Sequence, residues 1–287
     1  MQKLTKLSER ILYLPPYQET DRPILGAVVG SERTLLIDAG NSSNHARQFR
    51  EELLAIGVKG DWLALTHHHW DHVFGIKEVG LPTISHSMTK QKITEMQNLS
   101  WTDSALERRL HEKTVTAFAL KAILMEFGNE RNIELSLPHL TFETKLTLDL
   151  GGISCVIEHV GGDHADDSII LYIPEEKVLF LGDCLYAYIS PGPWSYTIEK
   201  SLQLVEHLRQ FDAEFVFLSH HDAPLNRDEF HYELSLLQKV AMLTKQCDGD
   251  EKLISQQLST HFNRELTEDE LETISFFMNG LQMEELN

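Results

Sequence analysis

The sequence predicts one large α/β unit in which two β-rich halves alternate with helical segments. Short apolar runs bounded by turn residues occur in residues 8–86 and again in residues 141–218. Segments with helical apolar spacing lie between and after them. Two β-rich halves are expected of a two-sheet sandwich, and a length of 287 residues suits one such unit.

The composition predicts an ordinary soluble core and excludes several kinds of partner. Lys plus Arg is 25 and Asp plus Glu is 44, so the net charge is −19. We therefore expect no nucleic-acid or membrane partner, because such affinity comes mainly from neutralising negative charge. The N-terminus has no apolar signal segment, and no apolar run is long enough to cross a bilayer. Cys155, Cys184 and Cys247 form no C-x-x-C pair and predict a reducing, cytoplasmic location.

The first half supplies strands around one amphipathic helix. Ala46, Phe49, Leu53 and Leu54 give residues 44–56 an apolar helical face. Strands are predicted at residues 10–14, 25–29, 34–38, 61–65 and 82–86.

The densest run of metal-ligating side chains follows the strand at 61–65. His67, His69, Asp71 and His72 form an H-x-H-x-D-H pattern. Side chains alternate along an extended segment, so His67 and His69 point the same way and can reach one cation. Asp71 and His72, at the turn into a helix, can reach a second cation beside it. Imidazole and carboxylate suit zinc, and two metals about 3.5–4 Å apart form a recognised hydrolytic unit.

This pattern after a strand resembles the metallo-β-lactamase superfamily. The resemblance implies a four-layer αβ/βα sandwich with a helical insertion and C-terminal helices. It also implies three further ligands, in the order His, bridging Asp, His. His164, Asp183 in a Gly-Asp pair, and His220 after the strand at 215–218 stand at those places. His221 is the alternative to His220.

The sequence departs from the family's usual motifs in two places. Around His164 the family usually has Gly-His-Thr-x-Gly-Ser, whereas Asp167 stands where the second Gly is expected. Ser219 replaces the Gly that usually precedes the last histidine. We predict that Asp166 and Asp167 form a turn, with acceptance of a hydrogen bond from a ligand imidazole as the alternative.

Other residues around the motif carry secondary predictions. His68 and Trp70, at the alternate positions, are expected in the core or behind the ligands. Asp38 begins an Asp-x-Gly that supports the metal loop in the family, although a plain turn explains it equally well. His86 is predicted to be structural.

The resemblance implies two divalent metal ions, with zinc as the first choice and iron or manganese as alternatives. A water shared by the two ions becomes a hydroxide nucleophile near neutral pH. Asp71 orients this hydroxide. Tyr186, three residues after Asp183, matches a lactonase tyrosine that bonds the reacting oxygen; an aromatic that lines the pocket is the alternative. The implied ligands are His67, His69 and His164 for one ion, Asp71, His72 and His220 for the other, and Asp183 as the bridge.

The function implied is a cytoplasmic hydrolase of a small ester, lactone, thioester or phosphodiester. The acidic charge weighs against the nucleases of the superfamily, and Asp183 stands where true β-lactamases generally carry Cys. Two alternatives remain open. One is a regulatory protein with a residual metal site that acts through a partner, and the other is a mononuclear iron sulfur dioxygenase.

The domain prediction divides the chain at the start of its C-terminal helices. Residues 1–225 are expected to form the metallo-β-lactamase-like domain. A helical insertion near 88–135 either covers the site as a lid or packs on the sandwich. Residues 226–287 form a helical extension with a capping box at Thr267–Glu270, packed on the body or on a second copy in a homodimer.

Overall fold

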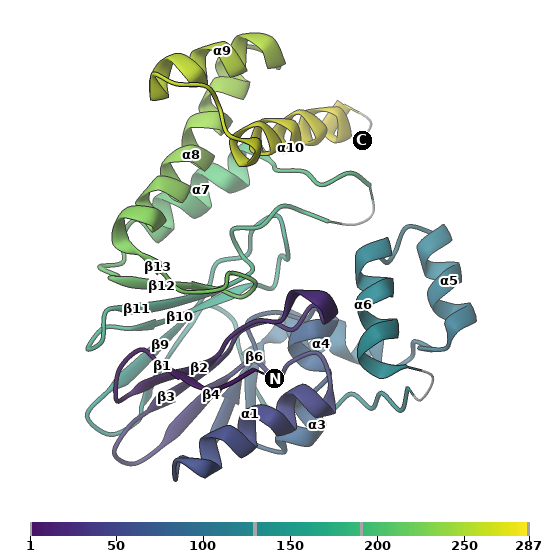
Figure 1. Ribbon diagram of the computed structural model, residues 1–287, viewed down its shortest axis with the longest axis vertical. Helices are drawn as coiled ribbons and strands as arrows, with labels where there is room; N and C mark the ends of the chain where they lie inside the picture. Colours follow the sequence, from purple (N-terminus) through teal and green to yellow (C-terminus); the bar gives the residue numbers. More distant parts are fainter. Residues whose placement is uncertain (1, 129–130, 190–191, 286–287) are drawn as a thin grey trace.

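The computed structural model describes residues 2–128, 131–189 and 192–285. Two mixed sheets face each other and carry helices on their outer faces, as predicted (Figure 1). The first sheet has the order β1 (Thr5–Lys6), β2 (Ile11–Leu14), β3 (Leu25–Val29), β4 (Thr34–Ile37), β5 (Trp62–Ala64), β6 (Thr83–His86) and β7 (Leu140–Phe142). The second has the order β13 (Leu225–Asn226), β12 (Phe215–Leu218), β11 (Val178–Gly182), β10 (Ile169–Ile173), β9 (Ser154–His159) and β8 (Lys145–Asp149).

The parallel pairs determine where polar loops gather. Strands β4, β5, β6 and β7 pair in parallel, and so do β11 and β12. The carboxyl ends of parallel neighbours lie at the same edge of a sheet. The loops that follow β4, β5 and β6 therefore emerge at one edge of the first sheet, and those that follow β11 and β12 emerge at one edge of the second.

The central strands β2, β4, β6 and β11 are buried on both faces, so their two sets of side chains serve two different cores. In β2, Ile11 and Tyr13 enter the core between the sheets, while Leu12 joins the core under the first helical layer. In β12, Phe217 enters the core between the sheets and stacks on Phe180 at 4.4 Å. This alternation explains why the predicted strands are almost continuous apolar runs.

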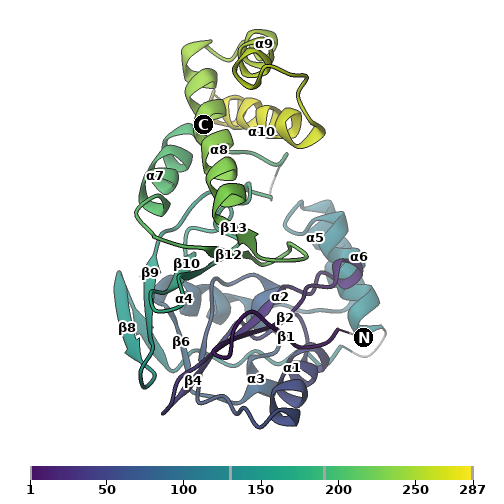
Figure 2. The same cartoon turned by 60° about the vertical axis from the view of Figure 1, so that its left-hand side comes forward.

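Two layers of helices pack on the sheets through apolar faces that recur at helical spacing. Helices α1 (Ser43–Ala55) and α3 (Ile76–Val79) cover the first sheet, and α7 (Ile198–Leu208) and α8 (Arg227–Gln246) cover the second (Figure 2). Helix α7 was not predicted, although Leu204, Val205 and Leu208 give it a buried face. The remaining helices are η1 (Gln18–Thr20), α2 (Trp70–Val73), α4 (Ser87–Met96), α5 (Asp103–His111), α6 (Ala117–Phe127), α9 (Glu251–Phe262) and α10 (Glu268–Glu285).

The insertion near 88–135 consists of α4, α5 and α6, and it packs on the body. The predicted helical stretch ends early, because Gly128 adopts a positive φ of 57° just after α6 and residues 131–138 are not helical. Arg22 and Glu126 form a partly buried ion pair at 2.7 Å that ties α6 to the segment after η1. Trp101 packs edge-on against Phe74 with ring centroids 4.7 Å apart.

The C-terminal helices share a core with the second sheet. Phe230 and Leu234 of α8 and Phe277 of α10 lie in the same buried cluster as Leu179 and Val216. Within the described ranges, no helix has both the length and the apolar content needed to cross a membrane.

The predicted capping box at the start of α10 is present and contains a fully buried carboxylate. The Thr267 backbone N–H donates to Glu270 Oε2 at 2.8 Å, and the Glu270 N–H donates to Thr267 Oγ1 at 3.3 Å. Arg264 holds the same carboxylate from the other side at 2.6 Å. Its hydrogen bond is the main cause that lowers the pKa of Glu270 to about 2.

We expect Glu270→Gln to reduce the free energy of unfolding at pH 7 by about 1.5–3 kcal/mol, because it removes charge-assisted hydrogen bonds from a buried site. Because the folded-state pKa is depressed, this contribution is present above the unfolded pKa of about 4.3 and is lost as the pH falls towards 2. Urea unfolding at pH 7 measures it. The exposed neighbour Glu268→Gln is the matched control. An equal effect of both substitutions would contradict the assignment.

Candidate metal centre

The structure brings all the predicted ligand residues to one edge of the sandwich. His67 and His69 follow β5, and Asp71 and His72 lie in α2. The other three residues come from the second half of the chain. His164 lies between β9 and β10, Asp183 follows β11, and His220 follows β12. The candidate centre is therefore assembled across both sheets.

A close backbone approach joins the two sheets beneath the centre. Gly182 has a φ of 55°, and a Cβ on it would lie 2.7 Å from Cβ of Thr66. Glycine is therefore required immediately before Asp183. The Ile169 N–H donates to Thr66 O at 2.9 Å, which adds a second link at the same place.

The ligand atoms fall into two groups, and one carboxylate oxygen of the second group also lies close to the first. His67, His69 and His164 form one group, and Asp71, His72, Asp183 and His220 form the other. Asp183 Oδ2 lies 3.3 Å from His164 Nε2 and 3.8 Å from His67 Nε2. The same oxygen lies 3.4 Å from Nε2 of both His72 and His220. This is the geometry expected of a bridging residue.

Several of these atoms are buried without a hydrogen-bond partner. Among the described residues, Nε2 of His67, His72 and His164 and Oδ1 of Asp183 have none. Buried polar atoms are normally satisfied, so this cluster of unsatisfied donors and acceptors indicates a missing partner. Imidazole nitrogen and carboxylate oxygen are the atoms that a divalent cation takes, so the donor set fits such a metal.

The two groups have different electrostatics. Burial and the adjacent His72 hold the pKa of His67 well below its ordinary value, so this imidazole is neutral at pH 7. Burial opposes protonation of His220, but Asp183 and Asp71 outweigh it and raise its pKa to about 10. Burial is likewise outweighed at His72, where Asp71 raises the pKa well above the usual range. Protons on these two imidazoles therefore balance the carboxylates of the second group.

We expect divalent metal binding at pH 7 to release protons from the second group, because a ligating imidazole must be neutral. The folded pKa values of His72 and His220 are raised, so apparent metal affinity should increase with pH until these groups are neutral, near pH 10 for His220. Zinc titration calorimetry in two buffers of different ionisation enthalpy measures the proton count. Identical heats in both buffers would contradict the prediction.

Residues behind the ligands fix their orientation. Asp38 Oδ2 lies 2.8 Å from His72 Nδ1, and its other oxygen accepts from the Thr66 N–H at 2.7 Å. Asp38 thus supports the metal loop as well as ending β4, with a positive φ of 60°. His164 Nδ1 lies 3.2 Å from Ala187 O. In both cases the outer nitrogen is engaged and Nε2 is left facing the centre.

Tyr186 lies over the junction of the two groups. Its ring centroid is 6.0 Å from that of His164 and 6.1 Å from that of His220. Its Oη accepts a hydrogen bond from the His220 N–H at 3.4 Å. Burial and the nearby Asp183 raise the pKa of the phenol, so it stays protonated and able to donate. His221 stacks on Tyr186 and lies outside both ligand groups.

Asp166 and Asp167 form the predicted turn, in which the Ser168 N–H donates to Ala165 O at 3.2 Å, but Asp167 also makes a contact that was not predicted. Its Oδ1 lies 2.8 Å from Nδ1 of His68, and the carboxylate is fully buried. His68 belongs to neither ligand group, so the alternative role, acceptance of a hydrogen bond from a ligand imidazole, does not apply. Asp166 pairs with Lys92. His86 has the structural role predicted for it, and it stacks on His159 at 4.0 Å. Trp70 packs with Phe74 in the core beneath the first helical layer.

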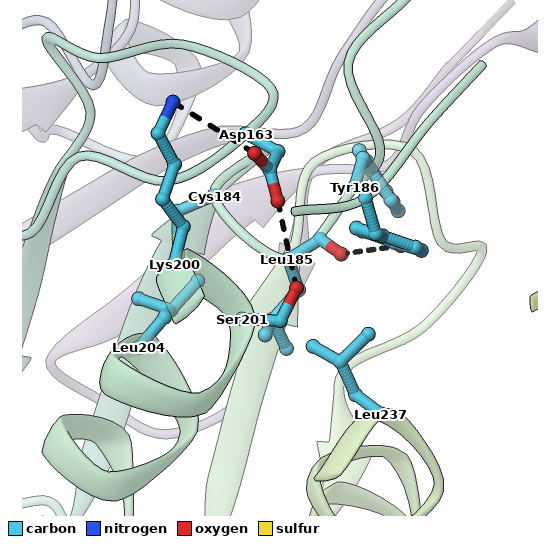
Figure 3. Close-up of a pocket in the computed structure, with 9 residues that line it drawn as sticks. Asp163, Cys184, Leu185, Tyr186, Lys200, Ser201, Leu204 and Leu237 are labelled. Carbon is cyan, nitrogen blue, oxygen red and sulfur yellow. Dashed lines mark hydrogen bonds and ion pairs between the residues drawn. The ribbon is translucent and has the colours of Figure 1, made fainter. Parts of the chain in front are cut away.

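Sequence reasoning missed a residue that anchors the His164 loop. The Thr197 N–H donates to Asp163 Oδ2 at 2.8 Å. Lys200 Nζ lies 3.8 Å from the other oxygen, and Ser201 Oγ donates from 3.5 Å (Figure 3). The loop is thereby tied to the start of α7. No pattern pointed to this contact, because α7 itself was not predicted.

Comparisons with known proteins agree on one fold. A family profile described as the metallo-beta-lactamase superfamily matches residues 25–220. A metallo-beta-lactamase from Pontibacter korlensis is similar at a TM-score of 0.59 and 20% identity, over 83% of this chain and 99% of that one. TMB-1 is similar at 0.57 and 15% identity, over 84% and 98%. The sec-alkylsulfatase Pisa1 from Pseudomonas sp. is similar at 0.63 and 14% identity, over 91% of this chain and 44% of that protein.

At these identities the likeness to solved structures is one of fold. No curated protein matches the sequence.

Proposed function

Because the chain belongs to the metallo-beta-lactamase superfamily, we propose that it is a metal-dependent hydrolase of a small uncharged acyl compound, an ester, lactone or thioester. The observation that carries the proposal is the pair of ligand groups that meet at Asp183 Oδ2. His67, His69 and His164 would hold one divalent ion, zinc by preference, and Asp71, His72 and His220 the other. Two such ions supply a nucleophile by lowering the pKa of a shared water toward about 7.

Two side chains supply the proton chemistry in this proposal. Asp71 lies in the first turn of α2, and its Oδ2 is 3.0 Å from His72 Nε2 and 3.2 Å from His220 Nε2. Burial works against its ionisation, but His72 and His220 keep its pKa below the usual range in the metal-free protein, so this carboxylate is ionised there. In the proposal Asp71 takes up the proton of the attacking water. The Tyr186 phenol donates to the carbonyl oxygen as negative charge develops there.

The charges around the centre favour a neutral substrate. Three basic side chains near the ligand segments are already paired with carboxylates. Arg22 pairs with Glu126, Lys92 with Asp166, and Lys200 with Asp163. A phosphodiester would have to compete with these carboxylates in a protein of net charge −19, whereas an uncharged acyl group meets no such repulsion.

The test is a metal analysis of the purified protein together with chromogenic ester, lactone, thioester and bis-phosphate substrates. We expect about two equivalents of metal and turnover on an acyl class. Two metals without hydrolysis would favour the regulatory alternative, in which the site acts through a partner. A single iron with oxygen consumption would favour the sulfur dioxygenase. The three cysteines are buried and unpaired, which supports our proposal of a cytoplasmic location.

A further inference from the structure

The last ligand residue faces a carboxylate from the opposite end of the chain. Asp21 Oδ1 lies 3.5 Å from His220 Nδ1. Both side chains are largely buried, with 16% and 19% of their surface exposed. His220 Nε2 points the other way, to Asp71 and Asp183. The imidazole therefore lies between the ligand group on one side and Asp21 on the other.

Hydrogen bonds join the backbone around Asp21 to the segment that carries His220. The Ile24 N–H donates to Ser219 O at 2.7 Å, and Gln18 Nε2 donates to His220 O at 2.6 Å. Between these contacts, Tyr17 and Arg22 exchange backbone hydrogen bonds of 2.9 and 3.1 Å and close the loop. Asp21 is thus held in place on both flanks.

The backbone of Asp21 has an unusual conformation, which is stabilised by contacts of neighbouring residues with other elements. Its φ of 56° and ψ of 41° are left-handed, and its N–H donates to Gln18 O as η1 ends. Aspartate tolerates this conformation better than most residues. The next residue, Arg22, binds Glu126 through two nitrogens at 2.7 and 3.1 Å. That anchor reaches the insertion helix α6 and maintains the loop that presents the carboxylate.

The arrangement repeats what Asp38 does for the other imidazole of the group. Asp38 lies behind Nδ1 of His72 at 2.8 Å, on the side away from the centre. A carboxylate behind a ligating histidine fixes its tautomer and raises its basicity. Each histidine of the second group thus has one aspartate behind it.

Resting on the proposed function, we propose that Asp21 is a positioning residue for His220. It accepts the Nδ1–H, so that the Nε2 lone pair is directed at the second metal position. Asp21 makes no contact with substrate in this scheme and acts through His220 alone. In this scheme, metal affinity at the second metal position depends on the segment that carries Asp21, which lies outside the H-x-H-x-D-H motif.

The experiment compares Asp21→Asn with Glu19→Gln, which removes an exposed carboxylate from the short helix η1 that Asp21 follows. Cobalt(II) titrations followed by visible absorption give the affinity of each equivalent. We expect Asp21→Asn to weaken one equivalent by about 10- to 100-fold and to leave the other unchanged. Glu19→Gln should match the wild type. Proton–nitrogen NMR of histidine-labelled, zinc-loaded protein should show a protected His220 Nδ1–H in the wild type that is lost in Asp21→Asn.

The outcomes separate the two proposals. Wild-type affinity for both equivalents in Asp21→Asn, with the Nδ1–H retained, would overturn the role of Asp21. Equal weakening of both equivalents together with a lower melting temperature would also overturn it, since that describes a structural residue. If the wild-type protein binds metal but hydrolyses none of the substrates, only the proposed function is overturned. The NMR signal of the His220 Nδ1–H still tests the role of Asp21, because that measurement does not depend on hydrolysis.

Discussion

Asp183→Ala is expected to abolish hydrolysis and to disturb both metal positions at once. The Asp183 Oδ2 atom is the one that lies within 3.3–3.8 Å of Nε2 of His67, His72, His164 and His220. Removing a group on which a whole catalytic unit depends lowers kcat by about 10⁴-fold or more. We also expect fewer than two equivalents of bound metal. Steady-state kinetics and elemental analysis of the same preparation measure both effects.

The control for Asp183→Ala is Asp228→Ala, which removes an exposed carboxylate from the first turn of α8. Circular dichroism should show that both variants retain the fold. Activity that persists in Asp183→Ala, with two metals still bound, would remove the basis of the bridging assignment.

Phe217→Ala is expected to be the most destabilising single substitution that we propose. The ring lies between the sheets and is 1% exposed. It stacks on Phe180 at 4.4 Å and meets Tyr13 edge-on at 5.0 Å. Truncation of a buried phenylalanine costs about 3–5 kcal/mol, from lost burial and from the cavity that remains. Guanidinium unfolding of the metal-free protein measures this change.

The exposed phenylalanine Phe118 of α6 provides the matched comparison for Phe217. Its side chain is 52% exposed, so Phe118→Ala should change stability by no more than about 0.5 kcal/mol. A similar loss of unfolding free energy in the two variants would mean that Phe217 is not tightly packed between the sheets.

The elements that the sequence predicted well are those defined by local pattern. The strands at 25–29 and 215–218 were predicted at the observed bounds, because their apolar runs end in turn residues. The H-x-H-x-D-H pattern is also local, since strand alternation alone brings His67 and His69 together. The assignments of His164, Asp183 and His220 needed the family resemblance, because no spacing rule relates them to residue 67.

The features that sequence reasoning missed depend on contacts between distant parts of the chain. The contact between Asp167 and His68 carried no sequence signal, because His68 lies in the other β-rich half. Helix α7 was missed because its apolar face is short and follows a loop rich in proline and glycine. Asp21 carried no sequence signal, since a lone aspartate after a Glu-Thr pair is an ordinary surface pattern. Such pairings arise only when the two sheets meet.

The close approach of Thr66 and Gly182 has a consequence for the supply of metal in the cell. Ligands from residues 67–72 and from 164–220 belong to different sheets, so bound cations would cross-link the two halves of the sandwich. Binding to the folded state alone adds RT ln(1 + [L]/Kd) to stability, about 2.7 kcal/mol at 100 times the Kd. If the proposed cations bind, metal starvation would therefore lower the amount of this protein through a larger unfolded fraction and its proteolysis, in addition to emptying the metal centre.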